Sequence, residues 1–124
     1  MFAEELRDQL RGVHAYALTV YRRDDIRTLD LDGFARNIAW AAERGVEIFV
    51  VAGGTGENDA LTSQERLAMT ERAIETVGDR ALLVPTLPGN LGEAVELARR
   101  YEQLGLRVAL AIPPVVRQRT PDDR

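Results

Sequence analysis

Four short apolar runs alternate along this chain with segments that have the periodicity of helices. The apolar runs are rich in β-branched residues and occupy residues 13–20, 46–52, 81–87 and 106–112. The segments between them carry apolar side chains three and four positions apart and occupy residues 31–44, 62–78 and 90–105. Because alternating strands and helices join parallel strands through right-handed crossovers, the sequence predicts an α/β fold with four parallel strands and three crossover helices.

The three helical segments carry agreeing start and stop signals. N-cap residues begin them and glycines end them: Asp30 to Gly45, Thr62 to Gly78 and Asn90 to Gly105. Thr62 is followed three residues later by Glu65, which is the pattern of a capping box. Since a cap contributes about 1 kcal/mol, these signals define the segment boundaries. A short leading helix is expected over residues 1–10.

The end of the chain bears on its domain organisation. Pro113 and Pro114 follow the fourth apolar run, and residues 117–124 have the composition of a loop leading toward a fourth helix that the 124 residues do not contain. The spacing of the strands suits both a doubly wound sheet and a (β/α)8 barrel. We therefore expect residues 1–124 to form a single domain, present in part.

The charged residues exclude several kinds of function. All 16 basic residues are arginines, so no side chain of the chain can form a Schiff base. The 20 acidic residues give a net charge of −4, which argues against a nucleic-acid partner. The chain has no cysteine, and no apolar run approaches the roughly 18 residues that cross a membrane. A cytoplasmic location without membrane contact is the default expectation.

The second apolar run leads directly into a glycine-rich turn. Gly53, Gly54 and Gly56 allow the backbone to approach a ligand and to direct successive N–H groups at an anion, and Thr55 adds a hydroxyl. This pattern predicts a seat for a carboxylate, although a tight strand-to-helix connection without a ligand has the same composition. The pattern matches neither the dinucleotide fingerprint nor a P-loop, which requires a lysine.

Other polar and aromatic residues have structural interpretations beside functional ones. Glu57 could act as a general base, but its place at the end of a turn favours hydrogen bonds to nearby backbone N–H groups. His14, the single histidine, is expected to pack in the sheet rather than to catalyse or bind zinc. Trp40 and Tyr101 are expected to pack on helix faces. Tyr21 follows the first strand, where barrel sites are built, so site-lining and packing roles both stay open.

Four aspartates cluster near the start of the first helical segment: Asp24, Asp25, Asp30 and Asp32. Their spacing differs from that of a calcium-binding loop, so a solvated turn followed by a helix cap is the preferred interpretation. No metal site and no cofactor are therefore expected.

Two motifs resemble those of a known family. Residues 53–57, Gly-Gly-Thr-Gly-Glu, and residues 61–66, Leu-Thr-Ser-Gln-Glu-Arg, are similar to signature motifs of the dihydrodipicolinate synthase and N-acetylneuraminate lyase superfamily of Schiff-base aldolases. Weaker matches follow in the same order: residues 19–21, Asp30 and residues 113–114. The resemblance covers roughly residues 11–123 and implies the N-terminal half of a (β/α)8 barrel, a fold of about 250 residues.

The resemblance implies a lyase that acts on 2-oxo acids such as pyruvate by aldol cleavage, condensation or dehydration, without a cofactor. Carried over by position, the N–H groups of Gly54 and Thr55 would bind the substrate carboxylate, and the Thr55 hydroxyl would relay a proton. Tyr21 would line the substrate site. Gly54 replaces the first threonine of the usual signature, a variant similar to the 5-dehydro-4-deoxyglucarate dehydratase branch.

The same resemblance places the rest of the machinery outside the chain. The family's Schiff-base lysine on the sixth strand and acid/base tyrosine on the fifth have no counterpart, and Val115 and Val116 stand where many members carry tyrosines. We therefore expect the chain to be inactive alone and to act within a homo-oligomer or beside a C-terminal half-barrel. Two alternatives are a non-catalytic half-barrel that assembles with itself and a truncated fragment that needs a C-terminal partner.

Overall fold

The computed structural model describes residues 2–113. Its elements, in chain order, are α1 (Phe2–Gln9), β1 (Ala15–Tyr16), α2 (Leu31–Glu43), β2 (Ile48–Val51), α3 (Ser63–Val77), β3 (Leu82–Leu87), α4 (Leu91–Gln103) and β4 (Leu110–Ala111). Two single-turn 3₁₀ helices, η1 (Asn58–Ala60) and η2 (Gly78–Arg80), flank α3. The predicted alternation of strands and helices is confirmed.

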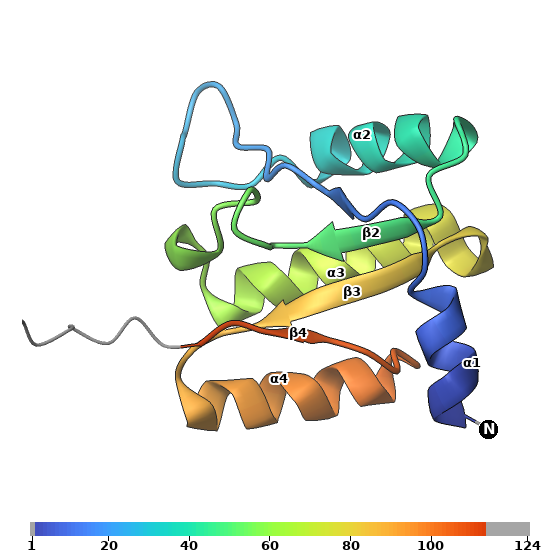
Figure 1. Cartoon of the computed structure of the whole chain (residues 1–124). Coiled ribbons are helices and arrows are strands. Elements are labelled where there is room, and N and C mark those ends of the chain that lie inside the picture. Colours follow the sequence, from blue (N-terminus) through green and yellow to red (C-terminus); the bar gives the residue numbers. More distant parts are fainter. Residues whose placement is uncertain (1, 114–124) are drawn as a thin grey trace, which may run out of the picture.

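The four strands form one parallel sheet in the order β1-β2-β3-β4. One helix links each strand to the next, so α2, α3 and α4 are the three predicted crossovers. Figure 1 shows these helices lying in chain order along the sheet, with the carboxyl ends of the strands at the left and α1 at the opposite end. The connections that follow the strands therefore gather at one end of the sheet, where parallel-sheet proteins build their sites.

The central and edge strands differ in length. β2 and β3 pair along Ile48 to Val51, and each has neighbours on both sides. β1 and β4 comprise two residues each, although the apolar runs predicted longer strands over residues 13–20 and 106–112. Both lie at an edge, where one neighbour alone supplies ladder hydrogen bonds, so their flanking residues leave the ladder early.

Apolar side chains pack on both faces of the sheet. The larger cluster joins one face to α2 and α3, and its most buried members are Phe34, Ile38, Phe49, Val51, Met69 and Ala73. The smaller cluster comprises Ile48, Val50 and Val84, with Leu10 and Val108 packed against it. Because successive side chains of a strand point to opposite faces, this second cluster lies on the other face, where the segment just after α1 covers it.

The predicted helix caps are present. The Asp30 carboxylate accepts a hydrogen bond from the Gly33 N–H at 2.9 Å. Thr62 and Glu65 form both bonds of a capping box, at 3.0 and 3.1 Å. Asn90 caps α4 by accepting from the Glu93 N–H at 3.0 Å. The observed helices end one or two residues before the glycines named as stops.

Three aromatic or ring side chains test the packing expectations. Tyr101 is buried, as predicted. Trp40 is 60% exposed, which contradicts the prediction, because it lies on the solvent face of α2 under the guanidinium of Arg44. His14 is half-buried and its Nε2 lies 2.7 Å from the Leu10 carbonyl oxygen, so it contacts the end of the leading helix.

Some predictions concern residues outside the described part of the chain. The loop expected over residues 117–124 and the positions of Val115 and Val116 lie there. Within residues 2–113, no helix has both the length and the apolar character needed to cross a membrane.

Candidate functional site

The turn after β2 has its carbonyl groups held by the surrounding structure. The Thr86 hydroxyl of β3 donates a hydrogen bond of 2.7 Å to the Ala52 carbonyl. The Thr19 hydroxyl, in the segment after β1, donates to the Gly56 carbonyl. Two side chains from neighbouring parts of the sheet therefore fix the start and the end of the turn.

Two further carbonyls accept hydrogen bonds from within the connection. The Glu57 N–H donates to the Gly54 carbonyl at 3.1 Å, and the Asn58 N–H donates to the Gly53 carbonyl at 3.2 Å. Because the C=O and N–H of a trans peptide point in opposite directions, these bonds turn the N–H groups of Gly54 and Thr55 away from Asn58 and Glu57. No described residue accepts a hydrogen bond from either N–H, and both residues are exposed. Two free, fixed donors of this kind can bind an anion.

The turn also requires unusual backbone conformations. Ala52 and Glu57 have φ angles of 59° and 60°, in the left-handed region that costs a non-glycine residue about 1 kcal/mol or more. At Gly56, an added Cβ atom would lie 2.9 Å from the Ala17 carbonyl oxygen, so the backbone leaves no room for a side chain. The surrounding contacts therefore impose the shape of the turn against its local preferences.

Gly54 stands in open space. A Cβ atom at this position would meet no atom within 4 Å. Gly54 borders a hollow of about 300 Å³ that Asn58, Asp59 and Ile112 also line. The position at which the usual signature has a threonine thus faces a free volume beside the two N–H donors.

Tyr21 lies in a neighbouring hollow of about 630 Å³ whose wall also contains Arg27, Glu57 and Glu65. Burial, a hydrogen bond to Glu57 and the negative charges of Glu57 and Glu65 raise the pKa of the Tyr21 phenol above its usual value of 10.0. Glu57 borders both hollows. The structure therefore brings Tyr21 next to the turn, but into a different hollow from Gly54.

The position of the Glu57 side chain differs from the sequence-based interpretation. We expected its carboxylate to accept hydrogen bonds from nearby backbone N–H groups, and no such bond occurs among the described residues. The Glu57 side chain lies beside the Tyr21 phenol instead.

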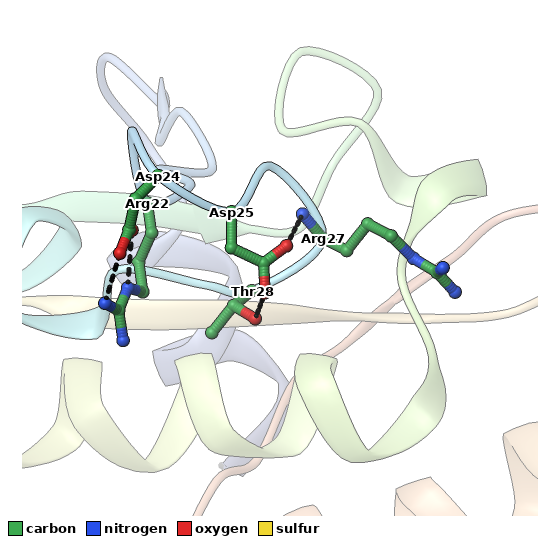
Figure 2. A network of polar contacts seen from close by, with 5 residues as sticks. All are labelled: Arg22, Asp24, Asp25, Arg27 and Thr28. Carbon is green, nitrogen blue, oxygen red and sulfur yellow. Dashed lines mark hydrogen bonds and ion pairs between the residues drawn. The ribbon is translucent and has the colours of Figure 1, made fainter.

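The loop between β1 and α2 is ordered by its own side chains (Figure 2). Arg22 donates to both carboxylate oxygens of Asp24, at 3.0 and 2.8 Å, and this contact lowers the pKa of Asp24. Asp25 accepts from the Thr28 hydroxyl at 2.6 Å and from the Arg27 N–H at 3.0 Å, and both bonds lower its pKa. In Figure 2 the Arg27 guanidinium points away from these contacts.

Asp24 and Asp25 lie in an exposed turn and Asp30 caps α2, as the sequence predicted, whereas Asp32 lies inside α2 and forms an ion pair with Arg72 of α3. Within residues 2–113, no group of three or more histidine, aspartate or glutamate side chains is arranged to hold a metal ion.

Two buried polar residues hold the turn, although the sequence analysis assigned them no role. Arg66 of α3 donates to the Asn58 carbonyl at 2.7 Å and to its side-chain oxygen at 3.1 and 3.0 Å. Thr86 is fully buried within the apolar strand β3. A hydroxyl in an otherwise apolar run, and the arginine of the 61–66 motif, are the sequence signals that could have identified them.

Comparison with known proteins places this geometry in a family. The model of the dihydrodipicolinate synthetase family matches residues 9–122. A 4-hydroxy-tetrahydrodipicolinate synthase from Moorella thermoacetica is 37% identical over 87 residues, which are 69% of this chain and 30% of that protein. A probable 5-dehydro-4-deoxyglucarate dehydratase from Pseudarthrobacter chlorophenolicus is 31% identical over 111 residues, which are 89% of this chain and 36% of that protein.

Solved structures agree at the level of the fold. The crystal structure of dihydrodipicolinate synthase from Bacillus clausii matches with a TM-score of 0.85 and 23% identity, covering 95% of this chain and 40% of that one. The chain thus spans roughly a third of the length of its curated relatives, and its four strands and crossovers correspond to part of a (β/α)8 barrel, as predicted. By sequence and by fold, the chain belongs to the dihydrodipicolinate synthetase family.

Proposed function

We propose that this chain supplies the carboxylate-binding part of a lyase that acts on 2-oxo acids, such as pyruvate, through a Schiff base. The observation that carries the proposal is the orientation of two peptide units. The carbonyls of Gly53 and Gly54 accept hydrogen bonds within the connection, so the N–H groups of Gly54 and Thr55 point the opposite way and have no acceptor among residues 2–113. They lie at the carboxyl end of a parallel strand, where barrel enzymes bind their substrates.

The chemistry follows from what each group can do. The substrate carboxylate accepts hydrogen bonds from the two N–H groups, which stabilise its charge without a basic side chain. The Thr55 hydroxyl relays a proton at the neighbouring carbon, and Tyr21 lines the approach from the adjacent hollow, which shares Glu57 with the hollow beside Gly54. The amine that forms the Schiff base comes from outside these 124 residues, since they contain no lysine. Alone, the chain binds substrate without turning it over.

A titration with pyruvate tests the binding step. In the isotopically labelled 124-residue chain, pyruvate should shift the NMR signals of the Gly54 and Thr55 amides in a saturable way. Thr55→Pro removes one of the two donors and should weaken binding about tenfold or more, because each hydrogen bond to a charged group contributes about 1.5–3 kcal/mol. Thr55→Val keeps the N–H and loses the hydroxyl, so it should bind pyruvate as the unsubstituted chain does.

Two results would contradict the proposal. One is an unchanged Gly54 and Thr55 spectrum at saturating pyruvate, and the other is equal binding by Thr55→Pro and Thr55→Val. Borohydride reduction in the presence of pyruvate should trap no adduct on any side chain of the isolated chain. A side-chain adduct detected by mass spectrometry would show that a group other than lysine forms the intermediate.

A second candidate function rests on the two edges of the sheet. Within the described part of the chain, β1 and β4 each have a neighbouring strand on one side only, and Tyr16, Leu18 and Leu110 are 45%, 59% and 37% exposed beside them. Unpaired edges with exposed apolar side chains favour pairing with another chain. The occupant would be a second copy of this chain or a C-terminal half-barrel.

Light scattering separates these occupants. A defined dimer of the purified chain would support self-assembly without catalysis. A monomer that becomes a defined heterodimer when a C-terminal half-barrel of the family is added would support the split enzyme. A monomer that stays single under both conditions would exclude the edge-pairing candidate.

A further inference from the structure

A buried guanidinium lies behind the carboxylate-binding turn. Arg66 is 5% exposed, and no described carboxylate lies within ion-pair distance of it. A charge removed from water without a counter-charge destabilises a protein unless hydrogen bonds compensate for it. The compensation must therefore come from the residues that Arg66 contacts.

All three hydrogen bonds of the Arg66 guanidinium within the described chain go to one residue, Asn58. Nε and Nη2 donate to its Oδ1 at 3.1 and 3.0 Å, and Nη2 also donates to its backbone carbonyl at 2.7 Å. This arrangement fixes both the side chain and the backbone of Asn58. A lysine could not reproduce it, because an ammonium lacks the planar fork of donors.

Asn58 transmits this restraint to the turn. Its N–H donates to the Gly53 carbonyl at 3.2 Å. The Gly53 carbonyl and the Gly54 N–H belong to the same planar peptide unit and point in opposite directions. Holding the carbonyl toward Asn58 therefore holds the Gly54 N–H away from Asn58, at an exposed residue that also has no atom within 4 Å of a Cβ position.

We propose that Arg66 is a positioning residue for the anion site: through Asn58 it fixes the peptide between Gly53 and Gly54 so that the Gly54 N–H faces the ligand. The positioning is a property of the folded chain and is independent of any ligand. Its effect on substrate affinity rests on the proposed function, because Arg66 can strengthen the binding of a carboxylate only if that carboxylate binds to these N–H groups.

Amide hydrogen exchange tests the positioning without a ligand. Arg66→Met replaces the guanidinium by an unbranched apolar side chain and so removes every hydrogen-bond donor. It should speed exchange of the Asn58 N–H by about tenfold or more, which corresponds to the loss of hydrogen bonds to a charged group. The matched control is Val77→Ala, because the buried valine is the last residue of α3, at the opposite end of the helix from Arg66, and its truncation is expected to lower global stability alone.

The test of positioning is the exchange rate of the Asn58 N–H in Arg66→Met and Val77→Ala, compared at equal global stability. Faster exchange at Asn58 in Arg66→Met but not in Val77→Ala supports positioning, and equal exchange in the two variants overturns it. Arg66→Lys keeps the charge without the fork and should behave like Arg66→Met. Full protection in Arg66→Lys would show that the fork is not what holds Asn58, and would equally overturn the proposal.

A second pair of variants covers the case in which Arg66→Met fails to fold. Asn58→Ala removes the Oδ1 that accepts two of the three bonds, whereas Asn58→Asp keeps an acceptor there. Exchange of the residue 58 amide should be faster in Asn58→Ala than in Asn58→Asp, and the reverse order or no difference would contradict the proposal.

Pyruvate affinity then tests the consequence for substrate. Arg66→Met should bind pyruvate about tenfold more weakly than Val77→Ala, since one of two oriented donors is no longer held. If the unsubstituted chain does not bind pyruvate, the proposed function fails while the exchange result still decides the positioning. If pyruvate binds equally to both variants although exchange differs, the Gly54 N–H is not part of the anion site.

Discussion

The turn over residues 53–58 and the loop over residues 22–28 follow neighbouring strands and lie at the same end of the sheet (Figure 1). The loop is exposed throughout and is held by contacts among its own side chains, such as Arg22 with Asp24. The turn contains buried residues and is held by side chains from β3, from α3 and from the segment after β1.

This difference separates two kinds of stability. Contacts between exposed charged groups contribute little to the free energy of unfolding, because water and salt screen them. Breaking a buried hydrogen bond costs about 1–3 kcal/mol, because the remaining partner stays desolvated. The turn is therefore part of the folded core and presents a rigid set of donors, whereas the loop beside it can change its sequence without affecting the fold. Substitutions should separate the two.

The largest effect is expected at Gly56. In Gly56→Ala the new Cβ would collide with the backbone of Ala17 and Ala52, at 2.9 and 3.3 Å, and backbone atoms cannot rotate away. We expect the free energy of unfolding to fall by about 3 kcal/mol, which denaturant titration measures. Gly54→Ala is the matched control in the same turn. Its Cβ meets nothing within 4 Å, so equal losses in the two variants would show that the turn is not packed as described.

A smaller loss is expected at Thr86. Thr86→Val keeps the shape of the buried side chain but leaves the Ala52 carbonyl without its 2.7 Å donor, at a residue that already has a strained φ of 59°. We expect a loss of about 2 kcal/mol. Thr70→Val is the control, because the Thr70 hydroxyl donates to the Arg66 carbonyl, which is already bonded within α3. A loss in Thr70→Val as large as in Thr86→Val would refute the special role of the Ala52 contact.

The sequence predicted the framework of this end of the sheet but not how the turn is held. The sequence of strands and helices along the chain, the crossovers and the caps follow from local signals, since apolar periodicity and capping residues such as Asp30 act within a few positions. The order of the strands in the sheet does not follow from these signals, because the strand spacing suited both a doubly wound sheet and a barrel. The short edge strands did not follow from them, because a run such as residues 106–112 does not reveal how many neighbours it will have. Trp40 shows the same limit, since helical periodicity does not tell which face another element covers.

The sequence indicated where the candidate site lies but not which residues hold the turn in place. Three glycines and a threonine after a buried strand mark residues 53–56 as the candidate anion-binding turn from the sequence alone. The residues that hold it are 8 positions away in the case of Arg66 and 34 in the case of Thr86. No local pattern relates them to the turn, because those contacts exist only once the strands and helices have packed.

The loop should respond to substitution in the opposite way from the turn. Asp25→Ala removes the acceptor for the Arg27 N–H and the Thr28 hydroxyl, both on the surface. We expect the midpoint of thermal unfolding to stay closer to that of the unsubstituted chain than in Gly56→Ala or Thr86→Val, while the Arg27 amide signal moves. A fall in the midpoint comparable to that of Thr86→Val would mean that the loop belongs to the same cooperative unit as the turn.

Acid should have the same local effect as that substitution. The pKa of Asp25 is lowered from 3.8 by the Thr28 hydroxyl and the Arg27 N–H, so these bonds are complete above pH 3.8 and are lost as the pH falls through the lowered pKa. The Arg27 amide signal should titrate in that acidic range in the unsubstituted chain and not in Asp25→Ala.

Tyr21 connects the two regions, because it immediately precedes the loop and interacts with Glu57 in the turn. Its pKa is raised above 10.0, first by burial and then by Glu57, so the neutral phenol stabilises the fold. That contribution is complete below pH 10.0 and is lost as the pH rises through the raised pKa.

In an ultraviolet titration, Tyr21→Phe should remove one high-pH ionisation, and Glu57→Gln should lower the pKa of that ionisation while burial still keeps it raised. Because burial comes first among the causes, this shift is the smallest effect expected here, and its absence in Glu57→Gln would mean that the loop and the turn are not in electrostatic contact.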